Sequence, residues 1–190
     1  MMNDSLSSPV LDQLTQVSQH NYQAIVAEIL SRYTLPLDGP HGILHWARVW
    51  RNGEVLAAET GADLEVVRLF ALLHDACRLN ENNDPGHGRR GARLAESWRG
   101  ALIHLSDARF AILAKACNEH TDGLVSKHPT IAACWDADRL DLGRVGVPME
   151  RVTLCTEAAK RIHPTVWTSA ALWHEPGGVL QLWGVSSPCG

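Results

Sequence analysis

Histidines and aspartates recur in this chain at positions where the apolar pattern predicts helices or helix ends. They fall in four short segments: HGILHWARV with His45, LLHDACR with His74 and Asp75, ACNEHTDG with His120, and WDADRLD with Asp136 and Asp138. Burying an imidazole beside a carboxylate costs free energy unless one partner satisfies both groups, and a divalent cation does so. Such a cation, with open coordination positions, can acidify a bound water and polarise a phosphoryl oxygen. The residues therefore indicate metal-dependent hydrolysis.

The ligand chemistry also bears on the identity of the metal. A set of two histidines and two aspartates leaves two positions of an octahedral shell open, unlike the closed thiolate sites of structural zinc. We therefore expect Mn²⁺, Mg²⁺ or Fe²⁺, with Zn²⁺, Co²⁺ and Ni²⁺ as alternatives. Asp75 is the residue that we expect to accept a proton from the attacking water while it binds the metal. Weaker alternatives for this acid–base role lie in the following loop: Glu81, Asn83 and Asp84.

Arginines close to these segments are candidates for binding a substrate phosphate, because the planar guanidinium suits phosphate oxygens. Two of them lie three or four residues beyond a histidine and so share its helix face. Two more follow His87 at an expected helix N-terminus, where free N–H groups also favour anions. The four candidates are Arg48, Arg78, Arg89 and Arg90. The alternative is that these side chains are solvated or paired with acidic residues.

The elements that must position these groups are helices. Apolar residues recur at three- and four-residue steps almost throughout, and no stretch alternates with period two, so the predicted fold class is all-α. After an N-terminal helical stretch, helices are expected over about 41–60, 64–73, 87–98, 107–117 and 129–140. A further helix is expected to open at Pro148 and to run through 162, followed by a short helix and a tail. Asp63 and Pro129 are suited to helix starts, and Gly61 to a helix end.

Length and composition favour one domain. The chain has 190 residues, a formal charge of -4 and 45% hydrophobic residues. We expect residues 1–40 to pack on a core of 41–145, and 146–190 to complete the same domain. The charge does not support strong nucleic-acid binding, and no apolar run could span a membrane. Five cysteines without a CxxC pair, and no signal-like N-terminus, favour a cytoplasmic protein with free thiols.

The order His45, His74-Asp75, Asp138 resembles the HD-domain superfamily of metal-dependent phosphohydrolases over about residues 41–145. The segment Ala137-Asp138-Arg139-Leu140 is similar to that family's last motif, which favours Asp138 over Asp136 as the ligand. Asp136 would then cap a helix or orient a ligand. The stretches DPGHGRRGA and DADRLDLG look like small bacterial HD hydrolases of unassigned substrate.

The resemblance implies a bundle of five or more helices with a metal held between them by His45, His74, Asp75 and Asp138. In relatives that bind two metals, later histidines complete the second site, and His87 and His120 are suitably placed for it. Alternatively, these two bind phosphate or lie at the surface. His41 is expected to end the loop before its helix.

The expected function is hydrolysis of a phosphate ester or anhydride in a small phosphorylated substrate, such as a nucleotide or related metabolite. Two alternatives remain: a noncatalytic HD module that binds metal or ligand, and a di-iron HD-type oxygenase. A homodimer is also compatible with the sequence. The Trp-rich C-terminal tail could cover the core, gate a pocket or bury a dimer interface.

Overall fold

The computed structural model describes residues 20–168 and 178–188, and these form a bundle of helices. The α-helices are α2 (Tyr22–Leu30), α3 (Ile43–Thr60), α4 (Leu64–Leu73), α5 (His87–Ser97), α6 (Asp107–Glu119), α7 (Pro129–Arg139), α8 (Glu157–Thr168) and α9 (Val179–Leu182). Two 3₁₀ turns, η1 (Leu142–Val145) and η2 (Arg151–Thr153), connect α7 to α8. No strand occurs in the described residues, so the all-α prediction is confirmed. The helical stretch expected before residue 20 lies outside them.

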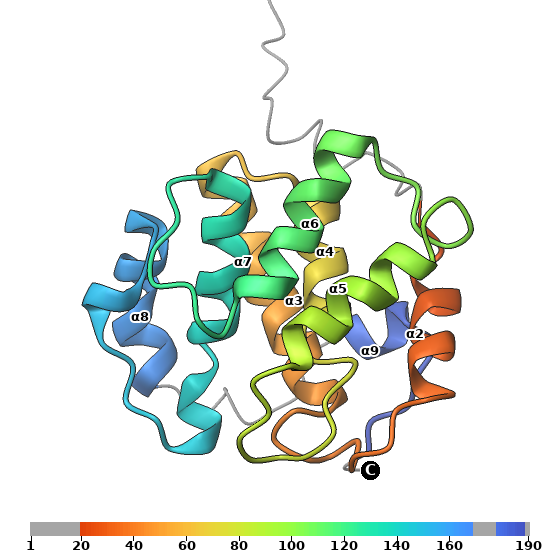
Figure 1. Ribbon diagram of the computed structural model, residues 1–190. Helices are drawn as coiled ribbons and strands as arrows, with labels where there is room; N and C mark the ends of the chain where they lie inside the picture. Colours follow the sequence, from red (N-terminus) through yellow and green to blue (C-terminus); the bar gives the residue numbers. More distant parts are fainter. Residues whose placement is uncertain (1–19, 169–177, 189–190) are drawn as a thin grey trace, which may run out of the picture.

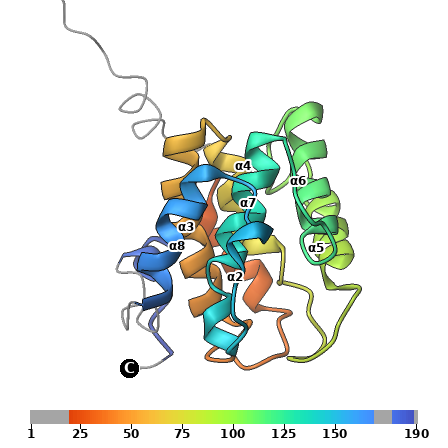
Figure 2. The ribbon, with the colours of Figure 1, turned by 90° about the vertical axis from the view of Figure 1, so that its left-hand side faces the viewer.

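The core of the bundle is built on α3, which packs against both α4 and α7. Helices α5 and α6 form a second pair, and α6 joins it to the core through α4 (Figure 1). Helix α8 lies on the α3–α7 side, away from α5 and α6 (Figure 2). Large side chains such as Trp46, Trp50 and Phe70 are fully buried in the core. Within the described part of the chain, no helix is long and apolar enough to cross a membrane.

Local chemistry sets the helix ends. The Asp63 carboxylate accepts a hydrogen bond from the Val66 backbone N–H at 3.2 Å and so caps α4. Gly61 ends α3 in the left-handed region, at φ 69°, where a glycine is favoured over residues with a side chain. Pro129 occupies the first turn of α7, where its missing N–H costs nothing. These three starts and stops agree with the sequence prediction.

The helix expected to open at Pro148 begins later. The chain remains irregular through η2, and α8 starts at Glu157. The reason is Asp136, whose buried carboxylate accepts the backbone N–H groups of Cys155 and Thr156, each at 2.7 Å, and the Thr156 hydroxyl at 2.8 Å. These long-range hydrogen bonds hold the residues before α8 in place. Asp136 therefore anchors the start of a helix and does not orient Asp138.

Several helix ends meet at one end of the bundle. His45 lies in the first turn of α3, and His87 is the first residue of α5. His74 and His120 directly follow α4 and α6, and Asp138 lies in the last turn of α7. Five segments that are distant in the sequence thus contribute one polar side chain each to the same region.

Candidate metal centre

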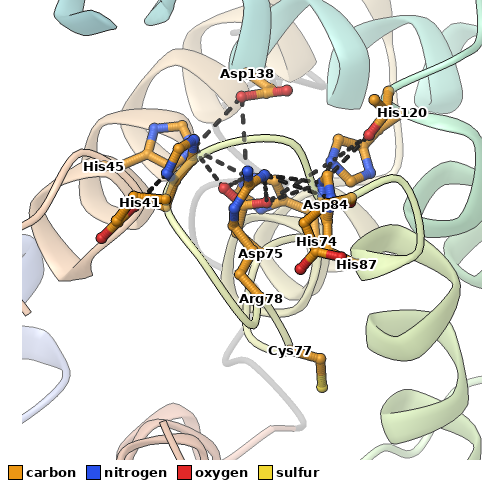
Figure 3. A network of polar contacts seen from close by, with 12 residues as sticks. His41, His45, His74, Asp75, Cys77, Arg78, Asp84, His87, His120 and Asp138 are labelled. Carbon is orange, nitrogen blue, oxygen red and sulfur yellow. Dashed lines mark hydrogen bonds and ion pairs between the residues drawn. The ribbon is translucent and has the colours of Figure 1, made fainter. Parts of the chain in front are cut away.

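Two clusters of ligand-type atoms lie side by side at this end of the bundle (Figure 3). We call His45, His74 and Asp138 the first triad. Its His45 Nε2 is 3.0 Å from His74 Nε2 and 3.4 Å from Asp138 Oδ1, and His74 Nε2 is 3.9 Å from Asp138 Oδ1. The sequence prediction grouped these three residues with Asp75.

The second triad consists of Asp75, His87 and His120. His87 Nε2 is 2.8 Å from His120 Nε2 and 3.2 Å from Asp75 Oδ1, and His120 Nε2 is 3.8 Å from the same oxygen. The other carboxylate oxygen, Asp75 Oδ2, lies 3.5 Å from His45 Nε2 and 3.7 Å from His74 Nε2. Asp75 therefore presents one oxygen to each triad.

Each of the four histidines is oriented through its Nδ1 atom. The Nδ1 atoms of His74, His87 and His120 lie within hydrogen-bond distance of backbone carbonyls, those of Phe70 and Ala71, of Asp84, and of Cys117. His45 Nδ1 instead lies 2.8 Å from the Asp141 carboxylate. Because carbonyls and carboxylates accept hydrogen bonds, each Nδ1 carries the hydrogen, and each Nε2 turns a lone pair toward the triads.

These lone pairs fit a divalent cation. Two bare Nε2 atoms 2.8–3.0 Å apart repel each other unless a positive charge lies between them. Ligands about 2.1 Å from a common ion are separated by roughly 3.0 Å in octahedral and roughly 3.4 Å in tetrahedral arrangements. The distances within the first triad, 3.0–3.9 Å, lie near this range.

The surroundings of these groups also favour the protonation states that bind a metal. Burial lowers the pKa of His45 well below its usual range, and nearby Arg144 lowers it further. Burial also lowers the pKa of His87 and His120. For Asp75, burial favours a higher pKa, but the electrostatic influence of the nearby histidines, His74 first, and of Arg78 outweighs it and lowers the pKa strongly. Neutral imidazoles and ionised carboxylates are the forms that bind metals.

Comparison with known proteins agrees with this geometry. The family model for the HD domain matches residues 42–165. The chain belongs to the HD domain family. A crystal structure of a predicted HD superfamily hydrolase from an uncultured Thermotogales bacterium is similar, with a TM-score of 0.59 and 26% sequence identity, covering 77% of this chain and 83% of that one. No curated protein matches this chain. Membership assigns the chain to a superfamily of metal-dependent hydrolases.

A cavity of about 210 Å³ opens at this HD-domain centre. Residues of both triads line it together with three arginines, which are Arg78, Arg139 and Arg144. Arg139 is committed to the backbone, because its Nη1 donates to the carbonyls of Leu124 at 2.9 Å and Thr153 at 2.6 Å. Arg139 Nη2 also donates to Gly123 O. Arg78 and Arg144 donate to carbonyls too, but Arg78 Nη1 and Arg144 Nη2 donate to none among the described residues, so these two arginines remain as cationic groups for the HD-domain cavity.

The arginines proposed from the sequence lie in different surroundings. Arg78 lines the cavity, whereas Arg48, Arg89 and Arg90 are not among its lining residues. Arg48 is buried and donates through Nε to Asp141 Oδ1 at 2.7 Å. Arg90 pairs with Asp84 at 2.5 Å, and Arg89 is exposed.

Among the three loop residues considered for acid–base chemistry, Glu81 contacts a cavity residue through its side chain, and Asp84 does so only through its backbone carbonyl. Glu81 Oε2 lies 2.5 Å from Nδ1 of His41, which lines the cavity. Asp84 instead accepts the Leu79 backbone N–H at 2.8 Å and closes its own loop. Asn83 is exposed.

The sequence reasoning missed Asp141 and Arg144. Both continue the spacing of Asp138 at steps of three residues, so the pattern DxxDxxR was a usable signal of one shared face. Arg144 is fixed by hydrogen bonds from Nε to Pro40 O at 2.5 Å and from Nη1 to Asp141 O at 3.0 Å. The sequence reasoning also missed Thr121, whose hydroxyl lies 3.2 Å from His87 Nε2.

Proposed function

We propose that this HD-domain protein is a metal-dependent phosphohydrolase that hydrolyses a phosphate ester or anhydride of a small metabolite, such as a nucleotide. The observation that carries the proposal is the cluster of inward-facing lone pairs around Asp75, beside a cavity with two available arginines. His45, His74, Asp75 and Asp138 would hold one divalent cation. His87 and His120 would hold a second together with Asp75.

A divalent cation at such a site supplies Lewis-acid chemistry, since it acidifies water and stabilises negative charge on phosphoryl oxygens. The contribution of the protein is positioning and electrostatic stabilisation. Asp75 is buried, and both its oxygens face histidine Nε2 atoms, which favours its role as a ligand. Its role as a proton acceptor stays a prediction.

Arg144 is the group we assign to the substrate phosphate on the side of the first triad. Its side chain is largely buried, and two of its three nitrogens are held by Pro40 and Asp141. The fixed guanidinium lines the cavity, so binding a phosphate there requires little loss of side-chain entropy. Arg78 occupies the side of the second triad, 3.4 Å from Asp75 Oδ1.

The proposal is tested by a screen of phosphate release. The wild-type chain, stripped of metal by a chelator, is assayed with Mn²⁺, Mg²⁺, Fe²⁺ and Zn²⁺. The substrates are nucleoside mono-, di- and triphosphates, inorganic pyrophosphate and p-nitrophenyl phosphate. We expect metal-dependent turnover of at least one of them, and a loss of at least about a thousandfold in Asp138→Ala. Metal binding with no turnover of any substrate would instead favour a noncatalytic module.

A di-iron oxygenase is a second candidate, because the second triad places three further ligand-type atoms beside the first. Oxygen consumption by the Fe²⁺-loaded protein, with no phosphate release under any metal, would favour it. The cationic arginines in the cavity favour an anionic substrate and hence the hydrolase.

A further inference from the structure

The two triads differ in their hydrogen-bond surroundings. At the first triad, no N–H or O–H group of the described residues contacts the Nε2 atom of His45 or His74. The neighbours of these atoms are each other and the carboxylate oxygens of Asp75 and Asp138. Because these groups carry only lone pairs toward one another, a cation is needed to compensate them.

The second triad already has donors. Arg78 Nη1 lies against the His87 ring, 3.3 Å from Nε2 and 3.4 Å from Nδ1, and is 3.4 Å from Asp75 Oδ1. The Thr121 hydroxyl lies 3.2 Å from His87 Nε2 and 3.4 Å from His120 Nε2. The guanidinium thus pairs with the Asp75 oxygen that faces this triad, and the hydroxyl is placed to donate to a histidine Nε2 atom, both of them atoms that a metal ion would bind.

Arg78 is fixed in this place. Its Nη2 donates to Asn82 O at 2.8 Å and its Nε to Asn80 O at 3.3 Å, and the residue is only 8% exposed. An ion bound about 2.1 Å from His87 Nε2 would lie no more than about 5.4 Å from Arg78 Nη1. Like charges at that distance in a buried site repel each other. To relieve the repulsion, Arg78 would have to break its loop hydrogen bonds.

We propose that Arg78 is a built-in cation that makes the two triads unequal. The first triad, with Asp75, holds one divalent ion tightly, and the second triad holds another only weakly because Arg78 already occupies its edge. This inference rests on the metal-binding part of the proposed function and not on hydrolysis. It implies that the protein holds a single ion over a wide range of metal concentrations, with Arg78 supplying positive charge on the other side of Asp75.

The test is a Mn²⁺ titration of the metal-free 190-residue chain, monitored by calorimetry and by the electron paramagnetic resonance signal of free Mn²⁺. For the wild type we expect one tight ion and a second whose Kd is at least about tenfold higher. Arg78→Met removes the charge and keeps the length of the side chain. We expect it to lower the second Kd by about tenfold or more, so that two ions survive gel filtration.

Two further variants separate the local charge from other effects. Arg93→Met removes the same charge from an exposed position of α5 and should leave both Kd values unchanged. Thr121→Val removes the hydroxyl donor and keeps Arg78, so the second ion should remain weak. If Arg78→Met does not fold, as judged by circular dichroism, Arg78→Gln replaces it in the same measurement.

Two equal Kd values in the wild type, or an unchanged second Kd in a folded Arg78 variant, would overturn the inference. So would equal tightening by Arg93→Met. The absence of any Mn²⁺ binding would overturn it together with the metal basis of the proposed function. If the two unequal sites are found but no phosphate is released from any substrate, the inference stands and only the hydrolase assignment fails.

Discussion

At the scale of single residues, His45 differs from the other three histidines of the centre because a carboxylate orients it. Asp141 lies 2.8 Å from its Nδ1 and also accepts Arg48 at 2.7 Å. Removal of such an outer partner typically weakens metal binding by about 10–100-fold. We expect Asp141→Ala to raise the Mn²⁺ Kd of the tight site by that factor, and Asp141→Asn to raise it less. Calorimetric titration measures both, and Asp107→Asn, at an exposed position, is the control.

A Kd in Asp141→Ala equal to that of the wild type would contradict the role of this carboxylate. The stability of the variant must be followed as well, because Arg48 is left without its buried partner. Urea unfolding measures the loss of stability, whereas the Mn²⁺ titration of the folded variant measures the loss of metal affinity, so the two effects can be separated.

Arg144 gives a second prediction at this scale. Arg144→Lys keeps the positive charge but loses the planar fork that Pro40 and Asp141 hold. A hydrogen bond to a charged group contributes about 1.5–3 kcal/mol, so we expect kcat/KM to fall by roughly 10–150-fold. The Mn²⁺ content should stay the same. Unaltered kcat/KM on the best substrate of the screen would contradict the assignment of Arg144 to the phosphate.

The residues of the two triads could be named from the sequence because the order of its histidines and aspartates resembles the HD superfamily, in which later histidines complete a second metal site. A histidine beside an aspartate is by itself a common pair. The arginines around the cavity were harder. Arg48 shares a helix with His45, yet Asp141, which is 93 residues away, holds it apart from the cavity. Sequence proximity to a ligand therefore selected Arg78 correctly, but it also selected Arg48 and missed Arg144. Arg144 reaches the cavity because it lies in η1, which follows Asp138 shortly after the end of α7.

At the scale of elements, the contribution of helix capping to stability can be tested at the start of α4. Asp63 caps the helix and receives two hydrogen bonds from Arg109, at 2.5 and 2.6 Å. We expect Asp63→Ala to lower the free energy of unfolding by about 1–3 kcal/mol at pH 7, as measured in urea. Asp63→Asn, which keeps a capping oxygen, should lose less. A loss below 0.5 kcal/mol in Asp63→Ala, on the order of a neutral surface change, would contradict this role.

The same residue makes a prediction about pH. Burial favours a higher pKa for Asp63, but the Arg109 hydrogen bond and the Val66 N–H outweigh it and lower the pKa. A lowered pKa in the folded state adds stability that is complete above the unfolded pKa, about 3.9. This part is lost as the pH falls through the folded pKa. The stability difference between wild type and Asp63→Asn should therefore shrink below about pH 4, and a constant difference between pH 7 and pH 3 would contradict it.

Helix α5 depends on glycine for its place beside the centre. A Cβ on Gly88 would lie 2.3 Å from Cys117 O and 2.9 Å from the His120 ring. We expect Gly88→Ala to destabilise the fold by about 1–3 kcal/mol, despite the higher helix propensity of alanine, and to weaken the second triad. Thermal unfolding and the Mn²⁺ titration measure these effects. Arg89→Ala, at the next and exposed position, should unfold like the wild type. A stabilised Gly88→Ala would contradict the close packing.

Most helices could be predicted from apolar spacing and caps, since both signals are local. The helix expected from Pro148 was wrong at its start because Asp136 holds Cys155 and Thr156 from 19 and 20 residues away. A long-range hydrogen bond of this kind leaves no periodic trace in the sequence. The same holds for the pairing of α5 with α6, which brings His87 to His120.

At the scale of the whole molecule, the centre ties together segments from α3 to α7. An ion at the first triad would join residues 45 and 138 and would bind only the folded chain. Ligand binding to the folded state at a hundredfold excess over Kd stabilises it by about 2.7 kcal/mol. For a chain of this length we expect Mn²⁺ to raise Tm by roughly 5–10 °C, with reversal by a chelator. The shift should vanish in His45→Ala, and an equal shift in that variant would indicate binding elsewhere.

The most direct test of the central claim is anomalous X-ray scattering from crystals of the wild-type protein grown with Mn²⁺. The account predicts a strong manganese peak at about 2.0–2.3 Å from His45 Nε2, His74 Nε2, Asp75 Oδ2 and Asp138 Oδ1. A fully occupied peak that lies away from these four atoms, or no peak near them at saturating Mn²⁺, would contradict it.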